Sequence, residues 1–162
     1  MVENYEDDFD HPPWPQQKAD NHSHILLAED DADMRKLLAL MLRREGYEVV
    51  ECVDGLELLQ QLKAACMPNA PYHPDLVVSD VRMSGMSGLD VLRRVRDCNG
   101  LPPIMLITAF GDEQTHTQAR RLGAVASIDK PFEISQFLEL VQSLIANFGS
   151  PDDANNEASD IV

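Results

Sequence analysis

Apolar residues occur along this chain with two alternating spacings. Continuous apolar runs at 25–28, 76–78 and 104–107 have the composition of strands buried on both faces of a sheet. The stretch 47–52 alternates apolar with polar residues and 125–128 is a short apolar segment, and both also predict strands. Between these stretches, apolar residues recur every three or four positions, which is the spacing of a helix. The pattern therefore predicts five strands that alternate with five helices.

The predicted helices begin and end at residues suited to those places. Asp31 and Asp54 each precede a helical apolar pattern, where an aspartate side chain can accept a hydrogen bond from an exposed backbone N–H. Gly46 and Gly123 follow the first and fourth patterns, where glycine ends a helix because it adopts a positive φ without strain. The fourth predicted helix, 112–121, is unusually polar.

Alternating strands and helices predict an α/β fold, a doubly wound parallel sheet with helices on both faces. The pattern occupies residues 23–148 and predicts one domain there. Residues 1–22 are rich in proline and acidic residues, and 149–162 are similarly polar. Segments with so few apolar residues bury too little surface to fold. We therefore expect a flexible acidic arm before the domain and a disordered acidic tail after it.

More than half of the net charge of −15 lies in these two end segments. Six acidic residues and one lysine in 1–22, with four acidic residues in 149–162, leave −6 for the predicted domain. A negative surface is a poor partner for phosphate backbones, so we expect no direct nucleic-acid binding. No apolar run approaches the ~20 residues of a membrane span, and the acidic start does not resemble a signal peptide. Together with three cysteines at no metal-like spacing, these features favour a cytoplasmic protein.

Polar residues stand where four of the predicted strands end. Because the carboxyl ends of the strands form the ligand-binding edge of a doubly wound sheet, these side chains should lie in one cleft. Taken singly, an aspartate here can be a helix cap, and a threonine or lysine can be an ordinary strand-end or surface residue. The occurrence of all these residues at one edge of the sheet is what indicates a functional site. The four strand ends carry Glu29-Asp30-Asp31, Asp80, Thr108 and Lys130.

A cluster of carboxylates at this edge has a chemical use. Carboxylates packed together repel one another, and a hard divalent cation such as Mg²⁺, which prefers oxygen ligands, removes the repulsion. A metal there draws in a phosphoryl donor, which Asp80 can attack as a carboxylate nucleophile to give an aspartyl phosphate. Lys130 offers a positive charge to the phosphoryl oxygens, and Thr108 offers a hydroxyl donor.

Four short stretches resemble the motifs of receiver domains, the response-regulator modules of two-component signalling. They are ILLAEDDADMR, LVVSDVRMSGMSG, PIMLITA and IDKPF, and the resemblance extends from about residue 24 to 148. It implies a flavodoxin-like fold with strand order 2-1-3-4-5 and a cis bond between Lys130 and Pro131. It also implies that the chain is not an ordinary enzyme: it would only phosphorylate itself from a phosphohistidine donor and slowly lose that phosphoryl group.

The resemblance implies a role for each matching residue and a set of partners. An upstream sensor histidine kinase or histidine phosphotransfer protein would supply the phosphoryl group. We expect a downstream protein to dock on the face of the fourth helix, fifth strand and last helix, and the fourth helix contributes the polar residues Gln114, Thr115, His116, Gln118, Arg120 and Arg121. The matching site positions are Glu29, Asp30, Asp80 and the backbone carbonyl of Arg82 for Mg²⁺, Asp80 for phosphorylation, Thr108 for the switch hydroxyl and Lys130 for the phosphate-binding lysine.

The chain departs from the family pattern in ways that affect the expected output. Ser84 stands where the family usually has proline, and Ser127 stands three residues before Lys130, where the family usually has an aromatic ring. That ring swings inward when the switch hydroxyl engages the phosphoryl group, and a serine cannot fill its pocket. We therefore expect a different route for the signal. Arg82 and Phe110, two residues after Asp80 and Thr108, are poorly suited to position an attacking water and predict a long-lived phosphoryl group.

Two alternatives to a phosphorylated switch remain open. A pseudo-receiver, a binding module that keeps the fold without phosphate signalling, is mildly favoured by Ser84 and Ser127. A metal-dependent phosphohydrolase on a similar sheet would need a second acidic residue as general acid where Arg82 stands, and is disfavoured.

Overall fold

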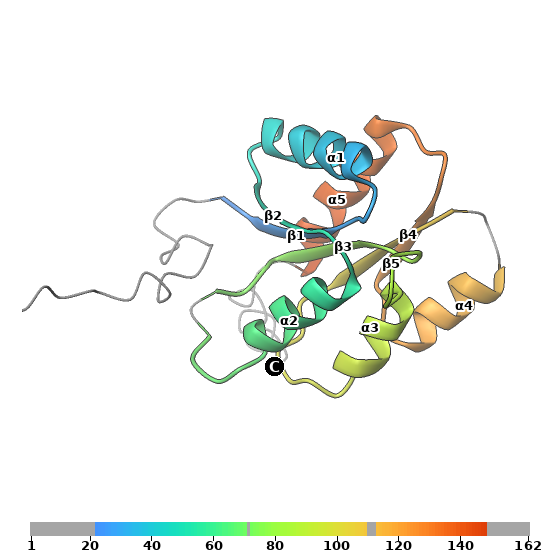
Figure 1. Cartoon of the computed structure of the whole chain (residues 1–162). Coiled ribbons are helices and arrows are strands. Elements are labelled where there is room, and N and C mark those ends of the chain that lie inside the picture. The colour runs from blue at the N-terminus through green and yellow to red at the C-terminus, as the bar shows by residue number, and fades with distance from the viewer. Residues whose placement is uncertain (1–21, 71, 110–112, 149–162) are drawn as a thin grey trace, which may run out of the picture.

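The computed structural model describes residues 22–70, 72–109 and 113–148. Strands and helices alternate as predicted, and the element bounds agree closely with the sequence pattern (Figure 1). The predicted arm and tail, Phe110 and the predicted start of the fourth helix at Asp112 lie outside the described residues. The elements are β1 (His24–Ala28), α1 (Ala32–Arg44), β2 (Glu48–Cys52), α2 (Gly55–Ala65), β3 (Leu76–Asp80), α3 (Gly88–Val95), β4 (Ile104–Thr108), α4 (Glu113–Arg121), β5 (Ala126–Asp129) and α5 (Ile134–Phe148).

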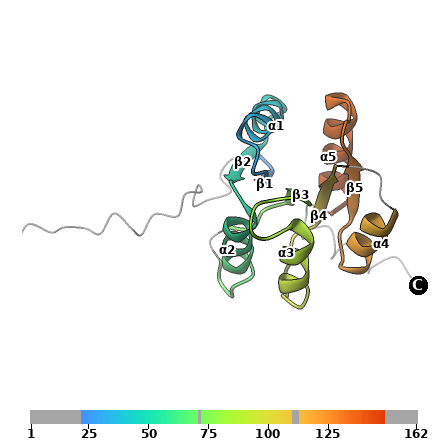
Figure 2. The same cartoon turned by 45° about the vertical axis from the view of Figure 1, so that its right-hand side comes forward.

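The strands form one parallel sheet in the order β2-β1-β3-β4-β5. Helices α1 and α5 cover one face, and α2, α3 and α4 cover the other (Figures 1 and 2). The order reverses between β1 and β3, so the loops that follow these two strands diverge to opposite sides of the sheet. The predicted doubly wound fold and its strand order are therefore confirmed, and the reversal marks the edge where a ligand site is expected.

Apolar side chains on alternate positions of each strand form a separate core on each face of the sheet. On the α2–α3 face they pack with Leu58, Leu62 and Leu92, and on the α1–α5 face with Leu38, Leu42 and Phe137. Both layers depend on central strands that are buried throughout their length. None of the helices in the described ranges is long and apolar enough to cross a membrane.

The predicted helix ends are confirmed by their hydrogen bonds and dihedral angles. Asp31 accepts from the backbone N–H of Met34 at 2.8 Å, and Asp54 accepts from that of Glu57 at 2.9 Å. Gly46 and Gly123 adopt φ angles of +92° and +98°, which a residue with a Cβ reaches only with strain. These caps fix where each helix begins and ends, and so where the loops at the sheet edge lie.

Candidate functional site

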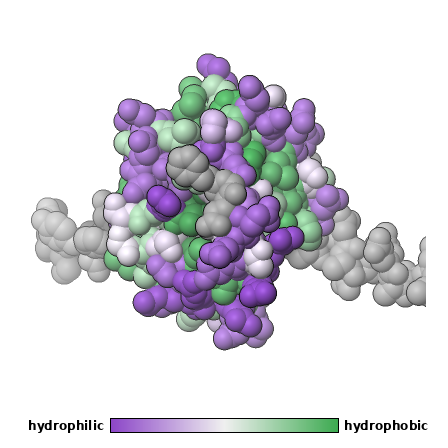
Figure 3. Space-filling view, turned by 90° about the vertical axis from the view of Figure 1, so that its right-hand side faces the viewer, coloured by the Kyte–Doolittle hydropathy of each residue, from purple (hydrophilic) through white to green (hydrophobic). Residues whose placement is uncertain are grey.

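The carboxyl ends of β1, β3 and β5 bring three charged side chains together. Glu29 directly follows β1, Asp80 is the last residue of β3, and Lys130 directly follows β5. The Lys130 ammonium donates hydrogen bonds to Glu29 Oε2 at 3.1 Å and to Asp80 Oδ2 at 2.5 Å. Glu29 and Asp80 are only 1% and 4% exposed. Two nearly buried carboxylates thus share one cation at the edge of the sheet, and Figure 3 shows the mainly hydrophilic surface on this side.

The electrostatics of this trio show an excess of negative charge. Burial raises the pKa of Glu29 to about 7, and the neighbouring Asp80 carboxylate adds to the rise against the opposing effect of Lys130. Burial alone lowers the pKa of the Lys130 ammonium, but its hydrogen bonds to Asp80 and Glu29 outweigh burial and raise it above its ordinary value. One lysine therefore does not fully balance the two carboxylates.

The loop after β3 holds the Asp80 carboxylate from its other side. Asp80 Oδ1 accepts from the backbone N–H of Arg82 at 2.9 Å. The loop is closed by the Gly88 N–H, which donates to the Val81 carbonyl at 2.9 Å. A Cβ on Gly88 would lie 2.5 Å from the Asp80 carbonyl oxygen, so the start of α3 packs directly against the backbone that carries the carboxylate.

The Asp30 side chain hydrogen-bonds to Ser84 rather than to this trio. Its side chain is exposed, and Oδ2 accepts from the Ser84 backbone N–H at 3.0 Å and from the Ser84 hydroxyl at 3.1 Å. Proline, which the family usually has at this position, could supply neither donor. In the part of the chain that the structure describes, no group of three or more His, Cys, Asp and Glu side chains is arranged to hold a metal ion. The serine at position 84 thus gives Asp30 two hydrogen bonds that a proline could not supply.

The donor set nevertheless suits a hard divalent cation. All candidate ligands are oxygens, from the carboxylates of Glu29, Asp30 and Asp80 and from the Arg82 carbonyl, and such cations prefer oxygen. Two carboxylates beside a single lysine also leave one negative charge in excess when both are ionised, which a cation would balance. The chemistry of the residues therefore fits Mg²⁺, and Asp30, whose Oδ2 accepts both Ser84 hydrogen bonds, would bind it through Oδ1 or by giving up those bonds.

Thr108, the predicted switch hydroxyl, takes part in a second polar cluster at the end of β4. Thr108 is 2% exposed, and its hydroxyl donates to the Asp129 carboxylate on β5 and lies 3.4 Å from the Ile128 carbonyl oxygen. Asp129 Oδ1 also lies 2.8 Å from Nε2 of His116, and the other ring nitrogen, Nδ1, hydrogen-bonds the Ser127 hydroxyl. The hydrogen bond from Thr108, aided by His116, holds the pKa of the Asp129 carboxyl below its usual range.

Asp129, His116 and Ser127 in this cluster were not predicted as site residues, although Ser127 was noted as a departure from the family pattern. Asp129 is the register partner of Thr108 across β4 and β5, so the pairing of the two strands could have identified it. His116 was predicted on a docking surface, but its side chain is only 21% exposed and contacts two residues of β5. The sequence carries no comparable signal for His116, because its contacts depend on how α4 lies against the sheet.

Comparisons with known proteins agree with the fold. A family model of the response regulator receiver domain matches residues 25–142. The chain belongs to this family. The receiver domain is 36% identical over 125 residues to the transcriptional regulatory protein PdtaR of Mycobacterium tuberculosis, covering 76% of this chain and 57% of that protein. It is 27% identical over 121 residues to the sporulation initiation phosphotransferase F of Bacillus subtilis, covering 75% of this chain and 92% of that protein.

A solved structure shows the same likeness. The non-phosphorylated HemR receiver domain from Leptospira biflexa superposes with a TM-score of 0.67 at 29% identity, covering 76% of this chain and 94% of that one. The chain spans about half the length of several curated relatives that it matches. Receiver domains are signalling modules of two-component systems rather than conventional enzymes. They interact with histidine kinases or phosphotransfer proteins and generally bind Mg²⁺ at the phosphorylation site.

Proposed function

We propose that this receiver domain accepts a phosphoryl group on Asp80 from a phosphohistidine of a sensor kinase or phosphotransfer protein. The observation that carries the proposal is the position of the Asp80 carboxylate. It is nearly buried at the end of β3, with one oxygen held by Lys130 and the other by the Arg82 N–H. A carboxylate fixed on both sides at the ligand edge of the sheet is oriented to act as a nucleophile.

Lys130 already contacts Asp80, whereas Thr108 changes its partner during the transfer. An Asp80 oxygen forms a bond to phosphorus, the phosphorus–nitrogen bond of the donor breaks, and its electron pair returns to the donor imidazole. Lys130 moves from pairing a carboxylate to pairing the new phosphoryl oxygens, for which its charge and reach are suited. Mg²⁺ bound by Glu29, Asp30, Asp80 and the Arg82 carbonyl would neutralise phosphoryl charge during the reaction. Thr108 would donate its hydroxyl to a phosphoryl oxygen once it leaves Asp129.

Beryllofluoride, which imitates a phosphoryl group on a carboxylate, provides the test. We expect a bound ¹⁹F resonance in the presence of Mg²⁺, and we expect Asp80→Asn to abolish it because the amide cannot serve as the acceptor. A control variant, Asp97→Asn, changes an exposed aspartate in the segment after α3 and should bind like the parent. A parent protein that gives no bound resonance would contradict the proposal.

The pseudo-receiver is the alternative that one observation favours. One carboxylate oxygen of Asp30, a proposed metal ligand, accepts two hydrogen bonds from Ser84. If those bonds prevented metal binding, the fold would persist and phosphorylation would not occur. A Ser84→Pro variant distinguishes the two functions, since it frees Asp30: beryllofluoride binding that appears only in this variant would identify the natural chain as a pseudo-receiver.

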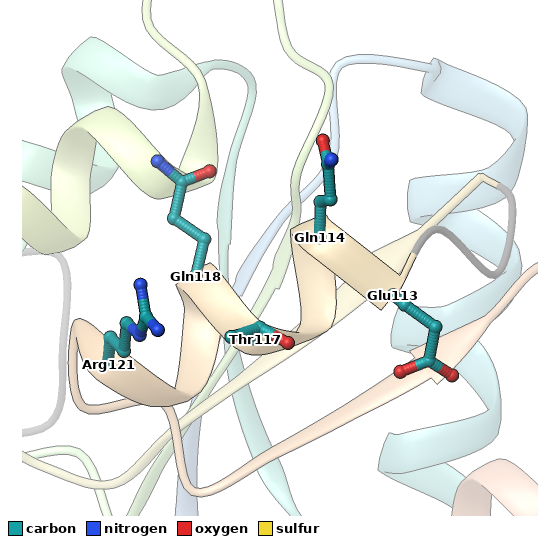
Figure 4. A pocket seen from close by; sticks show the side chains of 5 residues that line it. All are labelled: Glu113, Gln114, Thr117, Gln118 and Arg121. Carbon is teal, nitrogen blue, oxygen red and sulfur yellow. The ribbon is translucent and has the colours of Figure 1, made fainter.

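We further propose that the output is a protein docking on the face formed by α4, β5 and α5. The mostly exposed side chains of α4 line an open pocket of about 390 Å³, formed by Glu113, Gln114, Thr117, Gln118 and Arg121 (Figure 4). The net charge of −15 disfavours direct nucleic-acid binding. Three free thiols suit a reducing compartment, which supports a cytoplasmic location. Amide chemical-shift changes confined to α4, β5 and α5 on adding a partner would test the docking face.

A further inference from the structure

Helix α4 contacts the rest of the fold through one buried apolar residue and through polar side chains. Among its described residues, Ala119 alone is buried. His116 lies one turn earlier on the same side, and it contacts Ser127 and Asp129 on β5 through both of its ring nitrogens. Because so little of this helix packs in the apolar core, the hydrogen bonds of His116 contribute to holding its first half in place. The position of α4 is therefore sensitive to whatever changes around His116.

These contacts continue without a break to the end of β4. Ser127 and Asp129 are two residues apart on β5, so their side chains leave the same face of the sheet. Asp129 is the register partner of Thr108, whose hydroxyl it accepts. The four side chains therefore form one path of hydrogen bonds, Thr108 to Asp129 to His116 to Ser127, from the proposed phosphoryl site to α4.

The donors and acceptors along this path follow from the chemistry of each group when the imidazole is neutral. A carboxylate only accepts, so Nε2 of His116, which faces Asp129, must carry a proton. In the neutral imidazole Nδ1 then has a lone pair and accepts the Ser127 hydroxyl proton. The Thr108 hydroxyl has a single proton, which it donates to Asp129. Thr108 therefore cannot donate to a phosphoryl oxygen without giving up Asp129.

We propose that His116 is a positioning residue that couples the Thr108 hydroxyl to the placement of α4 through Asp129. The inference rests on the proposed phosphorylation of Asp80. When Thr108 turns to the phosphoryl group, Asp129 loses its first donor and is free to shift with His116. The hydrogen bonds of His116 to β5 are then held less firmly, and the attachment of the first half of α4 weakens. A polar path thus replaces the aromatic ring that the family usually has at the position of Ser127.

Hydrogen exchange of α4 amides, measured with and without beryllofluoride and Mg²⁺, tests this coupling. In the parent, bound beryllofluoride should speed exchange in α4 by about tenfold or more, on the scale of losing a hydrogen bond to a charged group. The His116→Phe variant keeps a ring but neither hydrogen bond. Its α4 amides should exchange fast before any addition and should change little when beryllofluoride and Mg²⁺ are added. Ser127→Ala, a smaller change, should shift exchange in the same direction. His116→Gln can donate to Asp129 and accept from Ser127, and should restore part of the response.

The outcomes separate this inference from the proposed function, because ¹⁹F spectra of the same samples report binding. Beryllofluoride bound to the parent with unchanged α4 exchange would overturn the coupling alone. A His116→Phe variant that responds like the parent would also overturn it, because the ring would then act through its size and not through its hydrogen bonds. A parent that binds no beryllofluoride would overturn the proposed function, and this inference with it.

Discussion

At the scale of single residues, Lys130 is the group on which the site depends. It is the shared partner of Glu29 and Asp80, whose side chains are 2% and 5% exposed. Removing one partner from a buried ion pair costs about 3–5 kcal/mol, because the remaining charge stays buried without compensation. The same shared cation would become available to a phosphoryl group as soon as Asp80 is phosphorylated.

The sequence predicts some of these residues better than others. Glu29, Asp80 and Lys130 could be brought together from sequence, because the carboxyl ends of parallel strands meet at one edge. Asp30 and Thr108 were placed at the same edge, but their present partners, Ser84 and Asp129, were not predicted. Side-chain direction beyond a strand end depends on competing local donors, which a spacing pattern does not contain.

The carboxyl of Asp129 gives a prediction about pH. Its pKa lies below the ordinary value of 3.8 chiefly because Thr108 donates to the ionised form. A lowered folded-state pKa contributes stability that is complete above the unfolded value and is lost as the pH falls through the folded value. Thr108→Val removes the donor, so the Asp129 pKa should rise toward its ordinary value. A carbonyl ¹³C titration measures it directly.

Thr108→Ser, which keeps the hydroxyl, is the matched control and should leave the low pKa of Asp129 in place. An Asp129 titration that is identical in the parent and in Thr108→Val would show that the Thr108–Asp129 hydrogen bond does not exist in solution. The path proposed from Thr108 to α4 would then lose its first step.

At the scale of elements, the start of α3 determines the geometry around Asp80. The predicted helix begins at Gly88 as observed, and Ser87 caps it in a reciprocal capping box with Asp90. The close approach of Gly88 to the Asp80 carbonyl could not be predicted, because it depends on how tightly the loop after β3 folds back. The helix caps Asp31 and Asp54 were predictable, since a cap is a local interaction between near neighbours.

Replacing Gly88 with alanine should damage the site despite alanine's higher helix propensity. The added Cβ would lie 2.5 Å from the Asp80 carbonyl oxygen and 3.3 Å from the Val81 Cα, and both are backbone atoms that cannot move alone. We expect a loss of about 1–3 kcal/mol in the free energy of unfolding, as for other overpacked sites. Urea denaturation measures the loss, and phosphorylation should slow as Asp80 is displaced.

Gly46→Ala is the control for a glycine far from the site in sequence. Its Cβ meets nothing within 4 Å, but the φ of +92° should cost about 1–2 kcal/mol. This variant should lose stability and keep the parent's phosphorylation rate. Equal phosphorylation rates in both glycine variants would contradict a special role for the contact between Gly88 and Asp80.

At the scale of the whole molecule, the arrangement of the sheet was the most predictable feature. Alternating strands and helices leave few topologies, and the order β2-β1-β3-β4-β5 is among them. The attachment of α4 was the least predictable, because a polar helix gives no periodic signal of the face it turns to the sheet. The excess of negative charge at the site favours cation binding there. A cation that binds only the folded protein stabilises the fold.

Mg²⁺ should therefore raise the melting temperature of the parent. A ligand that binds only the folded state adds about 2.7 kcal/mol at a concentration one hundred times its Kd. Asp30→Asn should reduce the shift, because it removes a charged ligand while its side-chain oxygen can still accept from Ser84. Differential scanning fluorimetry with increasing Mg²⁺ measures both proteins. Equal shifts in the two would remove Asp30 from the metal site.

The central claim is that Asp80 accepts a phosphoryl group, and covalent labelling tests it most directly. The parent, Asp80→Asn and Asp97→Asn are each incubated with Mg²⁺ and phosphoramidate, and intact mass is recorded. We expect one added phosphoryl group on the parent and on Asp97→Asn, and none on Asp80→Asn. A parent that gains no mass, or an Asp80→Asn variant that gains as much as the parent, would contradict the claim.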